Sequence, residues 1–347
     1  MATPTGHLAL PLEPLRRFAC QVYQRLGVPP ADAETIVEAQ LEADLRGVDT
    51  HGLQRLPWYV GYLQRGENNP CPQVRVVHQT PFSLLVDGDN GLGQLVCTRA
   101  VELALAKARQ QGLALCGVRR SNDWGCGAVY ALRAARAGLL CFATTTSVPL
   151  LAPYGSRTRL LGNNPMVFAV PRGQGPPLVL DMALTPVAMG KVLRAQAEGR
   201  PIPAEWGFQD RDGRPTSDPA AALRGIIPAI GAYKGTGLSL MMNLLAGVLP
   251  GGHQTSEVGP GRRGHFFLLF SPDVFGQQEA FYEQVERLVQ QVKGAEPLPG
   301  VAEVFLPGEI EERAYQQRLA QGVVLYPASL VAELRQLGSD LGVPFPA

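Results

Sequence analysis

Helical and extended patterns are segregated along this sequence, and their order constrains the fold more than any single motif does. Apolar residues recur at helical spacing through most of the first 70 residues and again after residue 276. Between residue 113 and about residue 180, short apolar runs separated by Gly, Pro and Asn are typical of strands. This order predicts an α+β fold in which the two chain ends pack together around a central sheet. We expect a helical domain from residues 1–75 plus 276–347 and a sheet-containing domain from residues 76–275.

Local patterns place the individual elements. In the first predicted helix, Leu15, Phe18, Val22 and Leu26 share one face, and Gly27 ends the helix. Helices are predicted at residues 12–27, 29–47, 96–112, 233–249, 278–294, 308–322 and 329–342, and strands at 74–79, 82–88, 113–118, 139–146, 166–171, 177–183 and 265–272. The segment 191–219 is polar, and its second half, 209–219, is predicted to be a loop.

Composition narrows the class of protein. The chain has 347 residues and a net charge of +1, which gives no strong attraction for nucleic acid or an anionic membrane. No apolar run approaches the roughly 18 residues of a membrane span, and no basic segment precedes an apolar one at the N-terminus. The cysteines lack metal-ligand spacing: Cys20, Cys71, Cys97, Cys116, Cys126 and Cys141. These features predict a cytoplasmic protein with no metal site and with neither nucleic acid nor membrane as a partner.

The usual nucleotide-binding motifs fail on this sequence. In "GCGAVY", which starts at Gly125, Tyr130 stands where the dinucleotide fingerprint needs its third glycine. "GLGQLV" from Gly91 fails in the same way, and "GAYKGTG" around Lys234 has the wrong glycine spacing for a P-loop. If the protein uses a nucleotide, it must bind it by another fold.

The segment "DTHGLQRLPWY" carries the sharpest local signal for chemistry. His51 and Arg55 are four residues apart and would share a helix face, which Tyr59 continues. A histidine exchanges protons near neutral pH, and an arginine binds a carboxylate through two parallel hydrogen bonds. This combination suits an acidic substrate with a reactive centre beside its carboxylate. A capped helix start with a solvated arginine would explain the same spacing.

Two lysines stand in positions that could meet a phosphate or a carboxamide. Lys191 ends "TPVAMGK", and Lys234 lies between glycines just before an apolar helical segment. Either could equally be a surface lysine in a turn.

Several longer segments form a pattern more specific than any one motif: "DLRGVDTHGLQRLPWYVGYLQRG", "DGDNGLGQ", "SNDWGCGAVY", "LDMALTPVAMGKV", "GAYKGTGLSLMMNLLAGVLPGG" and "GHFFLLFSPDVF". In this order they resemble the type-2 malate/L-lactate dehydrogenase family, and the resemblance covers nearly the whole chain. Its members include malate, sulfolactate and ureidoglycolate dehydrogenases, 2,3-diketogulonate reductase, and piperideine/pyrroline-2-carboxylate reductases.

The resemblance implies a non-Rossmann fold and a cofactor. NAD or NADP would lie on a large, mostly antiparallel sheet flanked by a helical domain from both chain ends, and the protein would be a homodimer. An imine reductase of this family would favour NADPH. The implied cofactor-binding positions offer small groups, backbone amides and a cation for a pyrophosphate and a nicotinamide amide. They are Ser147, Asp181, Met182, Ala183, Lys234, Pro307, Gly308 and Glu309.

The resemblance also implies roles at the substrate. His51 matches a proton donor, Arg55 matches the arginine that orients the substrate carboxylate, and Thr50 keeps the hydroxyl of a more usual serine. Tyr59 is expected beside them. Asp123 is the main departure, because many members carry a histidine there.

Three interpretations of Asp123 remain open at this stage. As a neutral acid near pH 7, its pKa would have to rise from about 3.9 at a cost of about 4 kcal/mol. As an ionised carboxylate, it would stabilise a cationic iminium or orient a protonated His51. As a helix cap, it would only bind the start of the following helix.

These expectations define three functions. The first is an NAD(P)H-dependent oxidoreductase that reduces C=N in a cyclic imino acid, or C=O, next to a carboxylate. The alternative is a 2-hydroxy-acid dehydrogenase of the malate/lactate type that uses His51 as its acid/base. The third is a cofactor-binding protein without redox turnover. In the first, His51 and Asp123 are the expected catalytic residues, and Thr50, Arg55 and Tyr59 bind the substrate.

Overall fold

The computed structural model describes residues 6–346. Its α-helices are α1 Leu12–Arg25, α2 Pro30–Leu45, α3 Leu56–Gln64, α4 Gly93–Gln111, α5 Ala128–Arg136, α6 Met189–Ala197, α7 Pro219–Arg224, α8 Tyr233–Asn243, α9 Gln278–Lys293, α10 Glu309–Gln321 and α11 Ala328–Leu341. Short 3₁₀ turns are η1 Asp49–His51, η2 Leu53–Arg55, η3 Ala204–Trp206, η5 Thr255–Glu257 and η6 Pro272–Phe275, and η4 Leu244–Val248 is a π-helical end to α8. The strands are β1 His7–Pro11, β2 Arg75–Gln79, β3 Ser83–Asp87, β4 Leu113–Ser121, β5 Leu140–Thr145, β6 Pro149–Leu151, β7 Leu161–Gly162, β8 Met166–Val170, β9 Leu178–Met182, β10 Arg263–Phe270 and β11 Val323–Pro327.

The main sheet has seven strands within the described residues, in the order β2-β3-β4-β10-β5-β8-β9. The β3–β4 pair is parallel, with α4 as its crossover, and the other neighbouring strands pair antiparallel. Strand β10 occupies the centre, where Phe267 lies opposite Cys116 of β4 and Ala143 of β5. The predicted α+β fold with a mostly antiparallel sheet is confirmed.

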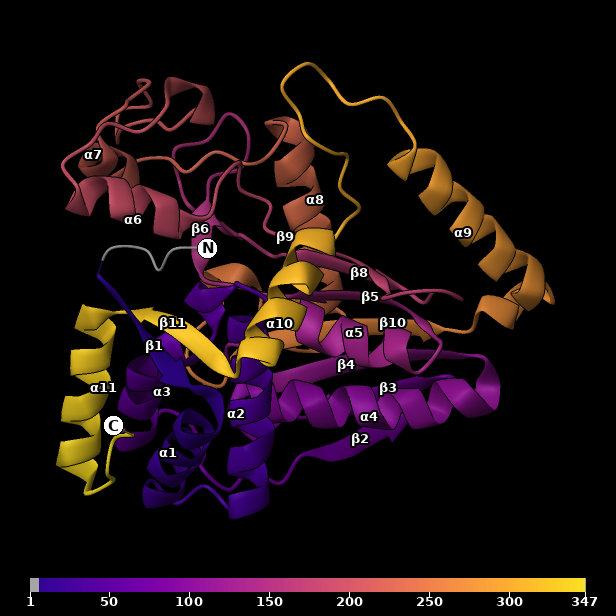
Figure 1. Ribbon diagram of the computed structural model, residues 1–347, viewed down its shortest axis with the longest axis horizontal. Helices are drawn as coiled ribbons and strands as arrows, with labels where there is room; N and C mark the ends of the chain where they lie inside the picture. The colour runs from indigo at the N-terminus through magenta and orange to yellow at the C-terminus, as the bar shows by residue number, and fades with distance from the viewer. Residues whose placement is uncertain (1–5, 347) are drawn as a thin grey trace.

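Helices α4 and α5 cover one face of this sheet and run along it in Figure 1. The residues that meet there are small, with Ala100 and Ala104 on α4 packing against Ala114 and Cys116 of β4 in one buried cluster. Small side chains let a helix approach a sheet closely. Buried and less buried residues alternate along β4, and α4 covers the face that carries the buried ones.

A second buried cluster joins the two ends of the chain. Strand β1 pairs antiparallel with β11, with Leu8 opposite Tyr326, and α1 and α3 pack against α11 (Figure 1). Helix α9 lies apart from this cluster, beside η6. The proposed division at residues 75 and 276 stays a prediction.

Elements that were not expected from the sequence include β1, β11 and α6. Strands β1 and β11 form a two-stranded sheet, although the N-terminal segment was expected to be helical and no strand was predicted near residue 325. Helix α6 lies at Met189–Ala197, partly within the polar segment where no helix was predicted. Its polarity reflects exposure, because only Val192 and Ala195 of α6 are buried.

Candidate functional site

His51 and Arg55 lie on two successive 3₁₀ turns rather than on one helix, so the predicted helix face is wrong. The break occurs at Gly52, where a Cβ would lie 2.0 Å from Oδ1 of the buried Asp44. The other carboxylate oxygen of Asp44 accepts hydrogen bonds from Leu53 N (2.9 Å) and Tyr326 Oη (2.6 Å). Burial raises the pKa of Asp44 to about 8. The turn that presents His51 is therefore held from beneath by α2 and by β11.

The two side chains still meet, as their spacing suggested. Arg55 Nη2 lies 3.3 Å from His51 Nε2, and Thr50 Oγ1 lies 2.9 Å from His51 Nδ1. Because a guanidinium only donates, Nε2 must accept, which leaves the proton on Nδ1 to be donated to Thr50. Burial, reinforced by the charge of Arg55, lowers the pKa of His51 to about 4. At neutral pH His51 is thus uncharged and able to accept a proton at Nε2.

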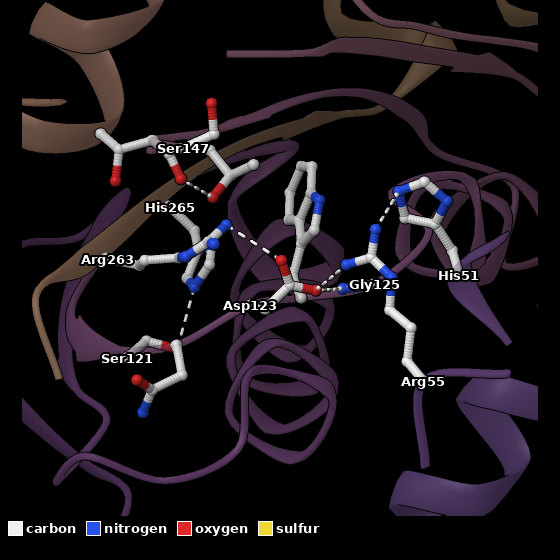
Figure 2. A network of polar contacts seen from close by, with 12 residues as sticks. His51, Arg55, Ser121, Asp123, Gly125, Ser147, Arg263 and His265 are labelled. Atoms are coloured by element: carbon white, nitrogen blue, oxygen red, sulfur yellow. Dashed lines mark hydrogen bonds and ion pairs between the residues drawn. The ribbon is translucent and has the colours of Figure 1, made fainter. Parts of the chain in front are cut away.

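Asp123 lies at the centre of this network, between Arg55 and Arg263 (Figure 2). Its Oδ1 accepts hydrogen bonds from Arg55 Nη1 (3.1 Å), Tyr59 Oη (2.8 Å) and Gly125 N (3.0 Å), and its Oδ2 lies 3.0 Å from Arg263 Nη1. Burial alone would raise the pKa of Asp123, but the charges of Arg263 and Arg55 outweigh burial and hold it below its ordinary value. The contacts contradict the neutral-acid interpretation, because every partner donates.

The helix-cap interpretation of Asp123 is also wrong. Helix α5 starts at Ala128 after Gly127, and no side chain caps it. The Asp123 carboxylate reaches only the N–H of Gly125, three residues before the helix. Asp181 instead accepts a hydrogen bond from Ala128 N at 2.8 Å. Asp123 is therefore an ionised, charge-paired carboxylate.

Arg263 was not predicted from the sequence. It begins β10 next to a register shift, and 13% of its side chain is exposed. Two residues on, buried His265 stacks on Trp124 with ring centroids 5.5 Å apart, and its Nε2 lies 2.9 Å from Ser121 Oγ. Burial lowers the pKa of His265 to about 3, so the ring is uncharged at neutral pH. Nothing in "GRRGHFF" marks either residue until β10 is known to lie beside β4.

A cavity of about 510 Å³ opens beside this cluster. Its wall includes predicted residues from separate parts of the chain: His51, Arg55, Asp123, Ser147, Asp181, Ala183, Pro307 and Gly308. Tyr59 instead lines a smaller adjoining cavity of about 60 Å³. Thr50, Met182, Lys234 and Glu309 line neither cavity.

The remaining lysines and Glu309 have other surroundings. Lys234 is exposed in the first turn of α8, and Lys191 is exposed on α6. The Glu309 carboxylate accepts Leu306 N at 2.9 Å and pairs with Lys293 at 2.9 Å. Glu309 thus caps its own loop, and its role toward a cofactor stays a prediction.

The groups along the larger cavity fit a dinucleotide. The backbone from Gly125 to Ala128 and the exposed Asp181 border it. The N–H groups of Gly125 and Ala128 are already bonded to Asp123 and Asp181, but the Asp181 carboxylate can also accept from ribose hydroxyls. Gly308 has φ +80°, and a Cβ there would lie 2.3 Å from Val179, which only glycine avoids. The cavity volume lies within the range of about 300–1,000 Å³ that is usual for ligand sites.

Two kinds of feature are absent from residues 6–346. Among these residues, no cluster of three or more His, Cys, Asp or Glu side chains could hold a metal ion. None of the helices in the same range is long and apolar enough to cross a membrane. Five of the six cysteines are buried, Cys71 is exposed, and all six are free thiols.

A mostly antiparallel sheet bordering a cavity lined by a histidine and two arginines is compatible with a dehydrogenase whose dinucleotide site is not a Rossmann domain. Residues 10–335 match the family model for malate/L-lactate dehydrogenase. The chain therefore belongs to the malate/L-lactate dehydrogenase family, and it is an NAD(P)-dependent dehydrogenase.

Individual relatives agree with this assignment. Malate dehydrogenase from Pyrococcus horikoshii is 34% identical over 97% of both chains, and its solved structure superposes with a TM-score of 0.91 over 100% and 99% of the two chains. The NAD(+)-named ureidoglycolate dehydrogenase of Escherichia coli K12 is 32% identical over 86% of each chain. An NADP(+)-named (2R)-3-sulfolactate dehydrogenase from Chromohalobacter salexigens is 35% identical over 92% of this chain and 94% of its own. Delta1-piperideine-2-carboxylate reductase from Pseudomonas syringae is 30% identical over 95% and 99% of the two chains, with a TM-score of 0.85.

Proposed function

We propose that this dehydrogenase interconverts a 2-hydroxy acid and its 2-oxo acid, with His51 as the acid/base. The observation that carries the proposal is an uncharged His51 on the cavity wall, with its proton on Nδ1 and its Nε2 accepting. Once the substrate carboxylate binds Arg55 and draws its guanidinium away from Nε2, the freed lone pair takes the hydroxyl proton as the alcohol is oxidised and returns it in the reverse reaction. The similarity to malate, sulfolactate and ureidoglycolate dehydrogenases supports the same chemistry.

The neighbours of His51 have distinct roles in this proposal. Arg55 and Arg263 provide the positive charge that attracts the substrate carboxylate, and Arg55 also contacts Nε2 of His51. Thr50 holds the imidazole tautomer, and Tyr59 orients Asp123 through its hydroxyl. Bound NAD or NADP accepts or supplies the hydride. Ser147, Asp181, Met182, Ala183, Lys234, Pro307, Gly308 and Glu309 stay proposed cofactor contacts, and five of them line the larger cavity.

Imine reduction is the second candidate, supported by the similarity to the piperideine-2-carboxylate reductase and by an ionised Asp123 beside the cavity. Its weakness lies in the same carboxylate. Oδ1 of Asp123 already accepts three donors, and Oδ2 faces Arg263. A carboxylate compensated by two guanidinium groups has little charge left to stabilise an iminium, so hydroxy-acid oxidation is the better supported function.

The experiment is a side-by-side assay of the purified protein. Reduced nicotinamide is followed with NAD and NADP, first with L-lactate and L-malate, then in reverse with pyruvate, oxaloacetate and piperideine-2-carboxylate. We expect the oxo acids to outperform the imine. Preference for the imine would overturn the proposal, and cofactor binding without turnover of any acid would identify a protein that has lost redox activity.

We also propose a homodimer located in the cytoplasm. Leu240, Met241, Leu244, Val248 and Leu249 are all exposed on consecutive turns of α8 and η4. A contiguous apolar face of this kind is typical of a subunit interface. The free thiols fit a reducing compartment. Light scattering after size exclusion would test the dimer, and a Leu244→Glu variant should dissociate it.

A further inference from the structure

The two cavities meet at the Asp123–Arg263 ion pair. Five residues line both cavities: Trp58, Tyr62, Asp123, Val148 and Arg263. A substrate whose reacting carbon lies near His51 would therefore direct its remaining substituent past this pair. The smaller cavity, of about 60 Å³, has room for a few non-hydrogen atoms.

The charges around this junction leave a single net positive charge. Arg55 and Arg263 are cationic, Asp123 is anionic, and His51 is uncharged. Of the residues that line the smaller cavity, only Asp123 and Arg263 are charged, and they are paired at 3.0 Å. The substrate carboxylate uses the net positive charge that remains.

The other charged groups on the larger cavity add no further positive charge that could bind an anion. Arg46 is compensated by Glu42 at 3.3 Å and by Glu312 at 3.1 Å. The further carboxylates on that wall, Asp181 and Glu311, add negative charge.

We propose that this enzyme selects monocarboxylic 2-oxo and 2-hydroxy acids with an uncharged substituent, and that the Asp123–Arg263 pair sets this specificity. This inference rests on the proposed 2-hydroxy-acid dehydrogenase function and names its substrate class. A second anionic group in the smaller cavity would lose its hydration without gaining an unpaired cation, because Arg263 is already paired with Asp123. The aromatic side chains of Trp58, Tyr59 and Tyr62 give that cavity a wall suited to an apolar or amide group.

The test compares two substrates of the same shape that differ by one charge. Oxaloacetate carries a carboxylate where 2-oxosuccinamate carries an amide. Both are assayed with the reduced cofactor, whose nicotinamide ring is uncharged and therefore does not affect the comparison. The second carboxylate of oxaloacetate would be desolvated in the smaller cavity without an unpaired cation, which we expect to lower kcat/KM by about 10²-fold. We expect the wild-type enzyme to prefer 2-oxosuccinamate by that factor. Equal or better use of oxaloacetate would overturn the inference.

Variants show whether Asp123 and Arg263 cause the preference. Asp123→Asn adds one net positive charge and should lower the preference for the amide by at least about tenfold. Arg263→Gln removes one positive charge and should strengthen it. The double variant Asp123→Asn/Arg263→Gln restores the net charge of the wild-type site and should again prefer the amide substrate. A preference that does not follow net charge across the three variants would refute the role of the pair.

A binding measurement separates this inference from the proposed function. Succinamate and succinate have nearly the same shape and the four-carbon length of oxaloacetate, and they differ by one charge at the far end. Calorimetry with reduced cofactor gives their Kd values for the wild-type protein without turnover or mutation. We expect succinamate to bind at least about tenfold more tightly. If no acid is turned over, the proposed function fails, but the two Kd values still test the charge preference. Tighter binding of succinate would refute it.

Discussion

Acidification to pH 5 should leave the oxidation rate nearly unchanged, because His51 titrates far below an ordinary histidine. With a pKa of about 4, about 90% of His51 is still neutral at pH 5. A histidine with its ordinary pKa near 6.5 would be only about 3% neutral there, a difference of roughly thirtyfold in the active form. The lowering corresponds to about 3 kcal/mol against the protonated ring, and burial is its main cause, followed by Arg55.

The assay is kcat/KM for hydroxy-acid oxidation from pH 4 to 8, because this parameter reports the free enzyme. We expect a plateau down to about pH 5 and a fall only near pH 4. His51→Gln should lower the plateau by about 10²- to 10⁴-fold. An inflection near pH 6.5 in the wild-type protein would refute the reasoning, as would an unchanged rate in the variant.

NMR titration of the His51 imidazole tests the cause of its lowered pKa without an activity measurement. Arg55→Gln removes a cation that touches Nε2, so the pKa of His51 should rise. Arg65→Gln is the matched control, since Arg65 is an exposed arginine paired with Glu67. If both variants titrate like the wild-type protein, the Arg55 contact does not lower the pKa of His51.

Three further predictions concern the groups that support the site. Gly52→Ala places a Cβ on the Asp44 carboxylate, so we expect the free energy of unfolding, measured with urea, to fall by at least about 2 kcal/mol. We also expect kcat to fall, and an unchanged Cm would contradict this prediction. Gly308→Ala combines φ +80° with a clash against Val179 and should weaken NAD(P) binding by fluorescence titration, whereas unchanged affinity would remove Gly308 from the cofactor wall. Burial raises the pKa of Asp44 to about 8, so between pH 4 and 8 the unfolded chain loses a proton that the folded protein keeps, and stability falls as pH rises. Asp44→Asn should flatten that part of the stability curve measured by Tm, and an unaltered slope would exclude Asp44 as its source.

Much of the fold could be predicted because periodicity is local. The alternation of buried residues along β4 and the apolar spacing in α1 are visible in the sequence, and both elements occur where expected. The β1–β11 pair could not be predicted, since it joins five-residue segments from opposite ends of the chain. A short strand gains its stability from a partner that no local pattern reveals.

In the site, too, local contacts could be predicted and long-range contacts could not. The contact between His51 and Arg55 follows from their spacing, although the backbone between them is not the expected helix. The state of Asp123 depends on Tyr59 from α3 and on Arg263 from β10, and Arg263 lies 140 residues further along the chain. Only the sheet order, which places β10 beside β4, brings that arginine to the carboxylate.

The hydrogen bond from Tyr326 to Asp44 has a consequence for biosynthesis. Tyr326 lies on β11, which pairs with β1, so the support under the His51 turn is translated after every strand of the main sheet. Domains fold as their segments emerge, and the central sheet is complete once β10 has been translated. A nascent chain that has not yet reached β11 would therefore carry a finished sheet and an unsupported catalytic turn. The turn that holds His51 would gain its support only when β11 pairs with β1.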